Sequence, residues 1–197
     1  DEIAKNGTLF KRMNNQSAWT NQNLVTIFTS LDPSVHGVST RMRNIDPNWV
    51  TPFEMLKKYK YLIPRLQGFL TDQNMSFMGF DDWEVMDPVN WLEKNHTKPF
   101  FLWYHILHPH LPYNPPDEYK YKFFNDKMIK NPESKKRVEI VMKEPIVPKG
   151  SVEFQEVDSE AINALYDGEI AYVDADMKRI IDKLKQLNIF DKSIIII

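Results

Sequence analysis

The sequence predicts an α/β protein, a layered α/β/α arrangement around a largely parallel central sheet. Residues 100–107 are aromatic and apolar between turn formers, which indicates a strand buried on both faces. Apolar residues then repeat at three- and four-residue steps over 159–187, the pattern of one long amphipathic helix. A second apolar run begins at residue 194. Strand, helix and strand in this order predict that 100–107 and 194–197 are neighbours in one parallel sheet.

The N-terminal third is predicted to contain two helices. Residues 1–6 read as the end of a helix that stops at Gly7, followed by a short strand over 8–13. A helix is expected over 20–31, where the apolar side chains have helical spacing. Those side chains are Leu24, Val25, Ile27, Phe28 and Leu31.

The middle of the chain carries clear start signals. Thr51 as N-cap, Pro52 at the first helical position and Glu54 at the third predict a helix to about residue 58. Residues 61–66 are expected to form a strand, and Pro64 places it at a sheet edge or a break. A short helix is expected over 88–95.

Residues 117–157 are predicted to form an excursion over the mouth of a site, with one helix near 133–141. Prolines at 145 and 148 and a glycine at 150 break the pattern beyond that helix. On the long helix that follows, Asp174 and Asp176 are expected to be exposed charges rather than ligands.

Composition indicates an ordinary globular protein of one or two domains, with 197 residues, 42% hydrophobic and 26% charged. A formal net charge of −2 favours neither a nucleic acid nor an anionic membrane as partner. No apolar run approaches the ~20 residues of a membrane span. The chain has no cysteine, which excludes disulfides and thiolate metal sites in this segment. The cell compartment is left open, with the cytoplasm favoured.

The start of the 20–31 helix is the first candidate site. Thr20, Asn21 and Asn23 are short polar side chains in its first turn. A helix start offers unpaired N–H groups and a positive dipole end, so it welcomes an anion. A hydroxyl at this point can act as a nucleophile. The alternative is that Thr20 only caps the helix.

Two motifs resemble one enzyme family. Thr-Ser-Leu-Asp-Pro-Ser-Val-His-Gly-Val (29–38) resembles the segment that follows the nucleophile helix in sulfatases and other members of the alkaline phosphatase superfamily. His-Pro-His-Leu-Pro-Tyr-Asn-Pro-Pro (108–116) resembles the family's proline-rich histidine loop, which follows a buried strand. The resemblance implies that 1–197 is the central part of one sulfatase-like catalytic domain. Its alkaline-phosphatase-like fold would be incomplete in this segment, with the true N-terminus upstream.

The resemblance also implies roles for individual residues. Thr20 stands at the family's nucleophile position and would be a ligand of a divalent metal ion, Ca, Mn or Zn, whose other ligands lie outside this segment. Asn23 and His108 would bind a small anionic ester, and His110 would bind it or protonate its leaving oxygen. The implied activity is a metal-dependent hydrolase or transferase acting on phosphate or sulfate esters.

Several departures from the family pattern keep alternatives open. A threonine cannot become the formylglycine of sulfatases, and the family's Lys-Trp-His signature is replaced at 65–70. A non-catalytic, sulfatase-like binding module therefore remains an alternative. His110 could be a loop histidine braced by prolines, and His36 is expected to be structural, donating to the backbone.

Overall fold

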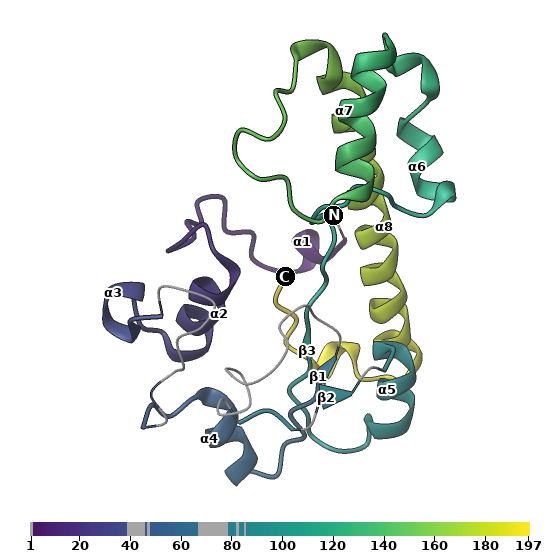
Figure 1. Cartoon of the computed structure of the whole chain (residues 1–197). Helices are drawn as coiled ribbons and strands as arrows, with labels where there is room; N and C mark the ends of the chain where they lie inside the picture. The colour runs from purple at the N-terminus through teal and green to yellow at the C-terminus, as the bar shows by residue number, and fades with distance from the viewer. Residues whose placement is uncertain (1, 39–45, 47, 67–78, 82, 85) are drawn as a thin grey trace. The chain divides into compact units, whose positions relative to one another are not determined.

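A computed structural model describes residues 2–38, 46, 48–66, 79–81, 83–84 and 86–197 (Figure 1). The chain divides into two units, which are described separately. The first comprises Asp1–Arg65, Leu70–Glu84 and Lys98–Trp103, and the second comprises Leu66–Phe69, Val85–Thr97 and Tyr104–Ile197.

The helices described in the first unit are short. They are α1 (Glu2–Asn6), α2 (Thr20–Thr29), α3 (Pro33–His36) and α4 (Pro52–Lys58). Helix α2 confirms the predicted helix but ends earlier, because Ser30 takes a left-handed φ of 58° and donates its N–H to Thr26 O. The strand expected over 8–13 is wrong, because the structure assigns no strand there.

Helix α4 begins with the capping box that the sequence predicts. The Thr51 hydroxyl accepts from the Glu54 N–H at 3.4 Å, and the Thr51 N–H donates to Glu54 Oε2 at 2.8 Å. Two of the otherwise unpaired N–H groups at this helix start are thus satisfied.

The core of the first unit is built around Phe28 of α2. Its ring centroid lies 4.8 Å from that of Phe53 on α4, 4.8 Å from that of Trp103 and 5.5 Å from that of Phe80. All three pairs meet edge to face, the arrangement that aromatic quadrupoles favour. The buried members of this core are Leu24, Val25, Phe28, Val38, Phe53 and Ile63.

A turn at residues 79–81 packs against α4. Gly79 has a φ of 87°, and a Cβ there would lie 2.8 Å from Glu54 Cγ and 3.0 Å from the Glu54 backbone N. Only glycine combines this φ with such an approach. The Asp81 carboxylate accepts the Ile63 N–H and lies 3.1 Å from Lys57 Nζ, which joins the turn to two other segments.

The sheet described by the structure is short and has the strand order β2–β1–β3. Its strands are β1 (Arg65–Leu66), β2 (Trp83–Glu84) and β3 (Trp103–Tyr104). The Phe101 N–H donates to Leu62 O at 2.8 Å and the Trp103 N–H to Pro64 O at 3.2 Å, so these segments run parallel. The parallel α/β prediction is confirmed. The strand predicted over 100–107 is shorter than expected, because Pro64 has no N–H to extend the ladder. Residues 100–106 are half-buried, so the prediction of a strand buried on both faces is wrong.

The strand predicted over 194–197 is not formed. The structure assigns no strand there, and Ile194 is 93% exposed. An apolar run becomes a strand only where another strand offers backbone partners, and none of the strands described here pairs with it. The predicted neighbourhood of 100–107 and 194–197 is therefore absent from the described residues.

Helix α8 (Ser159–Gln186) is the longest element of the second unit and confirms the helix predicted over 159–187. Figure 1 shows α6 and α7 beside its first half and α5 beside its last half. The other helices here are α5 (Pro88–Asn95), α6 (Asp117–Phe123), α7 (Pro132–Lys143) and the 3-10 turns η2 (Asp126–Met128), η3 (Glu156–Asp158) and η4 (Phe190–Lys192). Buried side chains of α7 and α8 form the core with Phe124, namely Val138, Val141, Ala161, Ala164 and Leu165.

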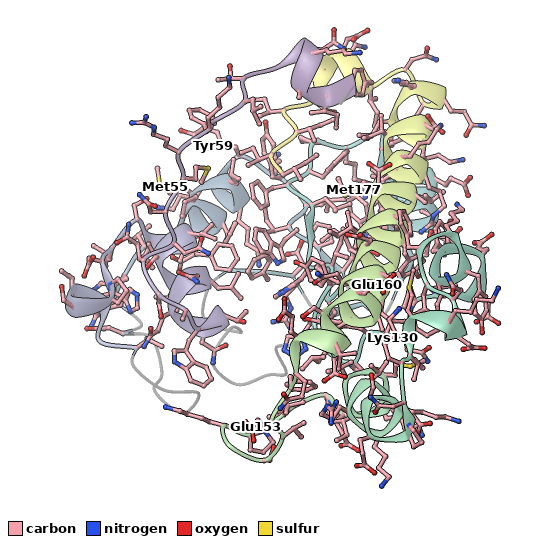
Figure 2. All side chains as sticks on the ribbon, turned by 90° about the horizontal axis from the view of Figure 1, so that it is seen from above. Met55, Tyr59, Lys130, Glu153, Glu160 and Met177 are labelled. Carbon is pink, nitrogen blue, oxygen red and sulfur yellow. The ribbon has the colours of Figure 1, made fainter. Side chains whose placement is uncertain are left out.

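Polar contacts tie α8 to its neighbours. Lys130 Nζ lies 2.7 Å from Glu160 Oε2 near the start of the helix (both are labelled in Figure 2). Near its end, Lys183 Nζ lies 2.6 Å from Glu93 Oε1 on α5. Asp176 was predicted to be an exposed charge, but it is half-buried and accepts the Tyr104 hydroxyl at 2.6 Å.

A buried ion pair joins α7 to the start of α8. Asp158 is fully buried and receives Arg137 through Nε at 2.6 Å and Nη2 at 3.1 Å. The Gln155 N–H donates to the same carboxylate at 2.8 Å. The hydrogen bond from Arg137 is the main reason that the pKa of Asp158 is lowered to about 2.

We expect the substitution Arg137→Met to destabilise the protein by about 3–5 kcal/mol, because it leaves a buried carboxylate without its cation. Urea unfolding followed by circular dichroism measures the loss. The control is Lys136→Met, which breaks an exposed pair with Glu133 on the same helix and should cost less than about 1 kcal/mol.

The pH dependence of the same pair provides a second check. The folded pKa of about 2 lies below the unfolded value of about 3.9. The stabilisation is therefore complete above the unfolded pKa and is lost as pH falls through the folded one. Arg137→Met should weaken this acid sensitivity between roughly pH 4 and 2. Equal acid sensitivity in both proteins would contradict the assignment.

Candidate functional site

Thr20 occupies the first helical position of α2. The N-cap is Trp19, with extended backbone angles and no side-chain capping bond. Thr20 is exposed, and its hydroxyl has no hydrogen-bond partner within the described parts of the chain. The alternative that Thr20 is the N-cap is therefore wrong. Its hydroxyl lies at the positive end of a helix that has no acidic residue in its first turn.

Asn23 forms hydrogen bonds with the segment that precedes Thr20. Its Nδ2 donates to Ser17 O at 2.6 Å, and its Oδ1 accepts the Ser17 N–H at 3.0 Å. Its backbone N–H donates to Trp19 O at 3.2 Å. Asn23 thus holds the segment before the helix in place, and both of its side-chain polar atoms already have partners. Its predicted role in binding the substrate stays a prediction.

His36 is buried beyond the other end of α2. The Val38 N–H donates to its Nδ1 at 3.1 Å, so Nε2 carries the ring proton and meets the Thr26 hydroxyl at 3.2 Å. A structural role with donation to the backbone was expected, and the ring both accepts the Val38 N–H and makes a hydrogen bond with the backbone of Gln22. Burial lowers the pKa of His36, which favours the neutral ring near pH 7.

In the second unit, His110 lies on the exposed part of the proline-rich loop 108–116. Its backbone N–H donates to Leu107 O at 2.9 Å, and its Nδ1 lies 2.6 Å from Leu111 O. A carbonyl can only accept, so Nδ1 carries a proton. The other ring nitrogen, Nε2, is then the atom that can take or give a proton.

His108 contacts a residue that sequence reasoning missed. Its Nδ1 bonds to Oε2 of Glu169, whose side chain is fully buried in α8. The ring edge of His108 also meets Tyr172, with centroids 4.9 Å apart and planes at 86°. The sequence did contain one indication that Glu169 is buried. It stands four residues after Leu165, which is also buried, and therefore on the core-facing side of the helix.

The loop 108–116 packs against α8 through two tyrosines and through the backbone at Gly168. Tyr113 meets Tyr166 with ring centroids 5.4 Å apart, and burial is the main cause that raises the pKa of Tyr113. A Cβ at Gly168 would lie 2.9 Å from Pro115 Cγ and 3.3 Å from Lys120 Cα. The backbone of α8 therefore comes unusually close to the loop and to α6.

The predicted site residues fall into two pairs. Thr20 and Asn23 lie in the first unit, and His108 and His110 lie in the second. Each pair is local to one element, α2 for the first and the 108–116 loop for the second. Their joint action on one ester stays a prediction.

The described residues do not by themselves fit the divalent metal implied by the resemblance. No group of three or more His, Cys, Asp or Glu side chains suitable for a metal occurs among them. The hydroxyl of Thr20 alone is a weak basis for such a site.

Comparison with known proteins identifies one family and two similar folds. The sulfatase family model matches residues 48–197, a range that includes His108, His110 and Glu169. The phosphonate monoester hydrolase of Agrobacterium radiobacter is 18% identical with a TM-score of 0.59, covering 90% of this chain and 52% of its own. Ps i-CgsB is 16% identical with a TM-score of 0.55, covering 85% of this chain and 44% of its own.

The chain thus spans about half the length of these two structures. At such identities the likeness concerns the fold, and both agree with a mixed α/β protein that has a short parallel sheet. No curated protein matches the sequence. Within the described residues, no helix has the length and apolar character to cross a membrane.

We expect Gly168→Ala to destabilise the protein by about 1–3 kcal/mol, because the added methyl would push against a proline ring and a backbone atom. Helix propensity alone predicts the opposite, a gain of about 1 kcal/mol. Thermal unfolding decides between them. Asn163→Ala, on the exposed side of α8, is the control and should be neutral or stabilising. A more stable Gly168→Ala protein would refute the close packing.

Proposed function

The chain belongs to the sulfatase family, and we propose that it is part of a hydrolase of phosphate or sulfate esters in which Thr20 is the nucleophile. A hydrolase and a transferase would share the first step, in which the Thr20 oxygen attacks the ester. They would differ only in whether the group then passes to water or to another acceptor. The substrate is a small anionic ester.

The observation that carries the proposal is the state of the Thr20 hydroxyl. It stands exposed at the first position of α2 and is not used as a cap, because Trp19 occupies that position. A hydroxyl engaged in capping would be a poor nucleophile, since its lone pair would already serve a backbone N–H. The N–H groups and the dipole of the helix start favour the anionic group that Thr20 would attack.

Phosphate or phosphonate esters are the favoured substrates. Thr20 cannot be oxidised to a formylglycine, so the sulfatase route through that group is closed to it. The fold neighbour from Agrobacterium radiobacter is a phosphonate monoester hydrolase, which supports the same choice.

The proposed chemistry proceeds in two transfers. The Thr20 oxygen gives its proton to the solvent and bonds to the central phosphorus, and the bond to the ester oxygen breaks. His110, protonated at Nε2, gives its proton to the departing oxygen as general acid. In the second transfer, a water molecule gives a proton to Nε2 of His110 and its oxygen bonds to the phosphorus. The bond from the phosphorus to Thr20 breaks, the Thr20 oxygen takes a proton from the solvent, and the acid anion leaves.

A divalent metal ion, Ca, Mn or Zn, is part of the proposal, with Thr20 as one ligand. Because the described residues supply no further ligand group, no step is assigned to it.

Thr20→Ala, made in the polypeptide that contains this chain, should lower turnover by several orders of magnitude, as the loss of a covalent nucleophile does. A screen of phosphomonoester, phosphodiester, phosphonate and sulfate chromogens measures the activity. Thr20→Ser keeps the hydroxyl and is the matched control, with activity well above that of the alanine variant. Near-normal turnover in Thr20→Ala would refute the nucleophile. A wild-type protein inactive on every ester would favour a non-catalytic binding module.

His110→Asn should slow esters with poor leaving groups more than activated aryl esters, because only poor leaving groups need a proton on the departing oxygen. The ratio of kcat/KM for an alkyl ester to that for a nitrophenyl ester measures the effect. An equal loss on both substrates would show that His110 binds the anion without giving a proton. The control is His96→Asn, a histidine at the end of α5 whose ring lies on backbone carbonyls.

A further inference from the structure

The carboxylate of Glu169 is buried, and burying a charged group costs free energy. Its side chain is fully buried within α8, and Oε1 has no hydrogen-bond partner in the parts of the chain described. An ionised group in such a place is retained only when a partner compensates for the lost hydration. The partner that the structure gives it is Nδ1 of His108, through Oε2.

The surroundings of the pair are held tightly. Directly before Glu169, the backbone at Gly168 lies against Pro115 of the same loop. The Tyr172 ring, one turn further along α8, contacts the side of the His108 ring and also meets Tyr119 of α6. The imidazole is thus held by a carboxylate at one atom and by an aromatic ring at its side.

We propose that Glu169 is a positioning residue that fixes the orientation and tautomer of His108, so that His108 Nε2 meets the anionic group of the ester. This inference rests on the proposed function for its substrate, but the pairing of the two side chains can be tested without turnover. Glu169 itself touches no substrate in this scheme.

The chemistry follows from the shape of imidazole. A carboxylate accepts, so Nδ1 carries a proton and the ring is anchored at that atom. The side chain of His108 is 37% exposed, so the ring is still accessible from outside while Glu169 is not. When Nε2 is protonated as well, the ring is a cation whose charge Glu169 balances. Such a cation donates to an anionic oxygen in a charge-assisted hydrogen bond.

His108 and His110 then have different tasks. The Nδ1 of His110 lies on the carbonyl of its own neighbour, Leu111, at 2.6 Å on an exposed part of the loop. The Nδ1 of His108 bonds to a buried carboxylate on another element. The two rings therefore differ in their anchoring atom: His110 is held by a neutral carbonyl of its own loop, and His108 by a side chain of α8.

The first test is nuclear magnetic resonance of the protein with nitrogen-15-labelled histidine. The chain has five histidines, and His108→Gln identifies the signals of His108. In the wild type, the shifts should show a proton on Nδ1 of His108. Glu169→Gln, which keeps the size but removes the charge, should move both His108 nitrogen signals. Asp167→Asn removes an exposed charge two positions away on α8 and should leave them unchanged.

Inorganic phosphate is the probe for the exposed nitrogen. Its addition should move the Nε2 signal of His108 in the wild type and move it much less in Glu169→Gln. A wild-type His108 with a bare Nδ1, or one whose signals ignore both phosphate and Glu169→Gln, would overturn the inference. If Glu169→Gln does not fold, the wild-type tautomer and the phosphate titration decide.

The second test uses kinetics and a double-mutant cycle. Glu169→Gln should raise KM for the ester about ten-fold, the effect of weakening one charged hydrogen bond, and change kcat less. In the His108→Gln background, the same substitution should change KM by less than about two-fold. Independent, multiplicative losses would show that Glu169 does not act through His108. A protein that hydrolyses no ester would contradict the proposed function, while the resonance test would still decide the pairing.

Discussion

At Gly168 the backbone of α8 comes so close to Pro115 and Lys120 that there is no room for a side chain. The second unit depends on this approach. It brings the proline-rich loop onto the helix and puts His108 within reach of Glu169. It also seats α6 beside the first half of α8. Without the loop at this position, the buried carboxylate of Glu169 would lack the His108 donor that compensates for its lost hydration, and an unpaired buried charge is the costly state.

Three charged side chains along α8 each pair with a different part of the second unit. Glu169 pairs with the loop, Asp176 with Tyr104 of β3, and Arg179 with Asp87 at the start of α5. An isolated exposed pair would add little stability. Here the partners come from separate parts of the chain. Each pair therefore fixes the position of one segment along the axis of α8. The apolar core of Ala161, Ala164 and Leu165 supplies the non-directional attraction.

Local signals explain what could be predicted from the sequence. The three- and four-residue spacing of α8 and the capping box of α4 involve neighbours along the chain, and both were confirmed. The extent of the strands could not be predicted, because a strand needs a partner, and the partner of 100–107 contains Pro64. The apolar run at 194–197 has strand composition without a strand beside it among the described residues.

In the candidate site too, the features that depend on neighbouring residues were predictable and those that depend on distant residues were not. The helix start at Thr20 and the loop over 108–116 depend on neighbouring residues and are formed as predicted, while the roles of Thr20 and His110 stay predictions. Trp19 as N-cap was not foreseen, since tryptophan lacks a capping oxygen and Asn23 sets the chain direction through Ser17. Glu169 was missed because its partner lies 61 residues away, a contact that no local pattern encodes.

The hydroxyl of Tyr104 has a consequence for the behaviour of the protein in alkali. Burial and the hydrogen bond to Asp176 together raise its pKa well above the ordinary value for a phenol. Deprotonation would set a phenolate beside the Asp176 carboxylate, which accepts the Tyr104 hydroxyl at 2.6 Å. Tyr104 should therefore stay protonated in alkali that ionises exposed tyrosines, and its hydrogen bond to Asp176 should persist there.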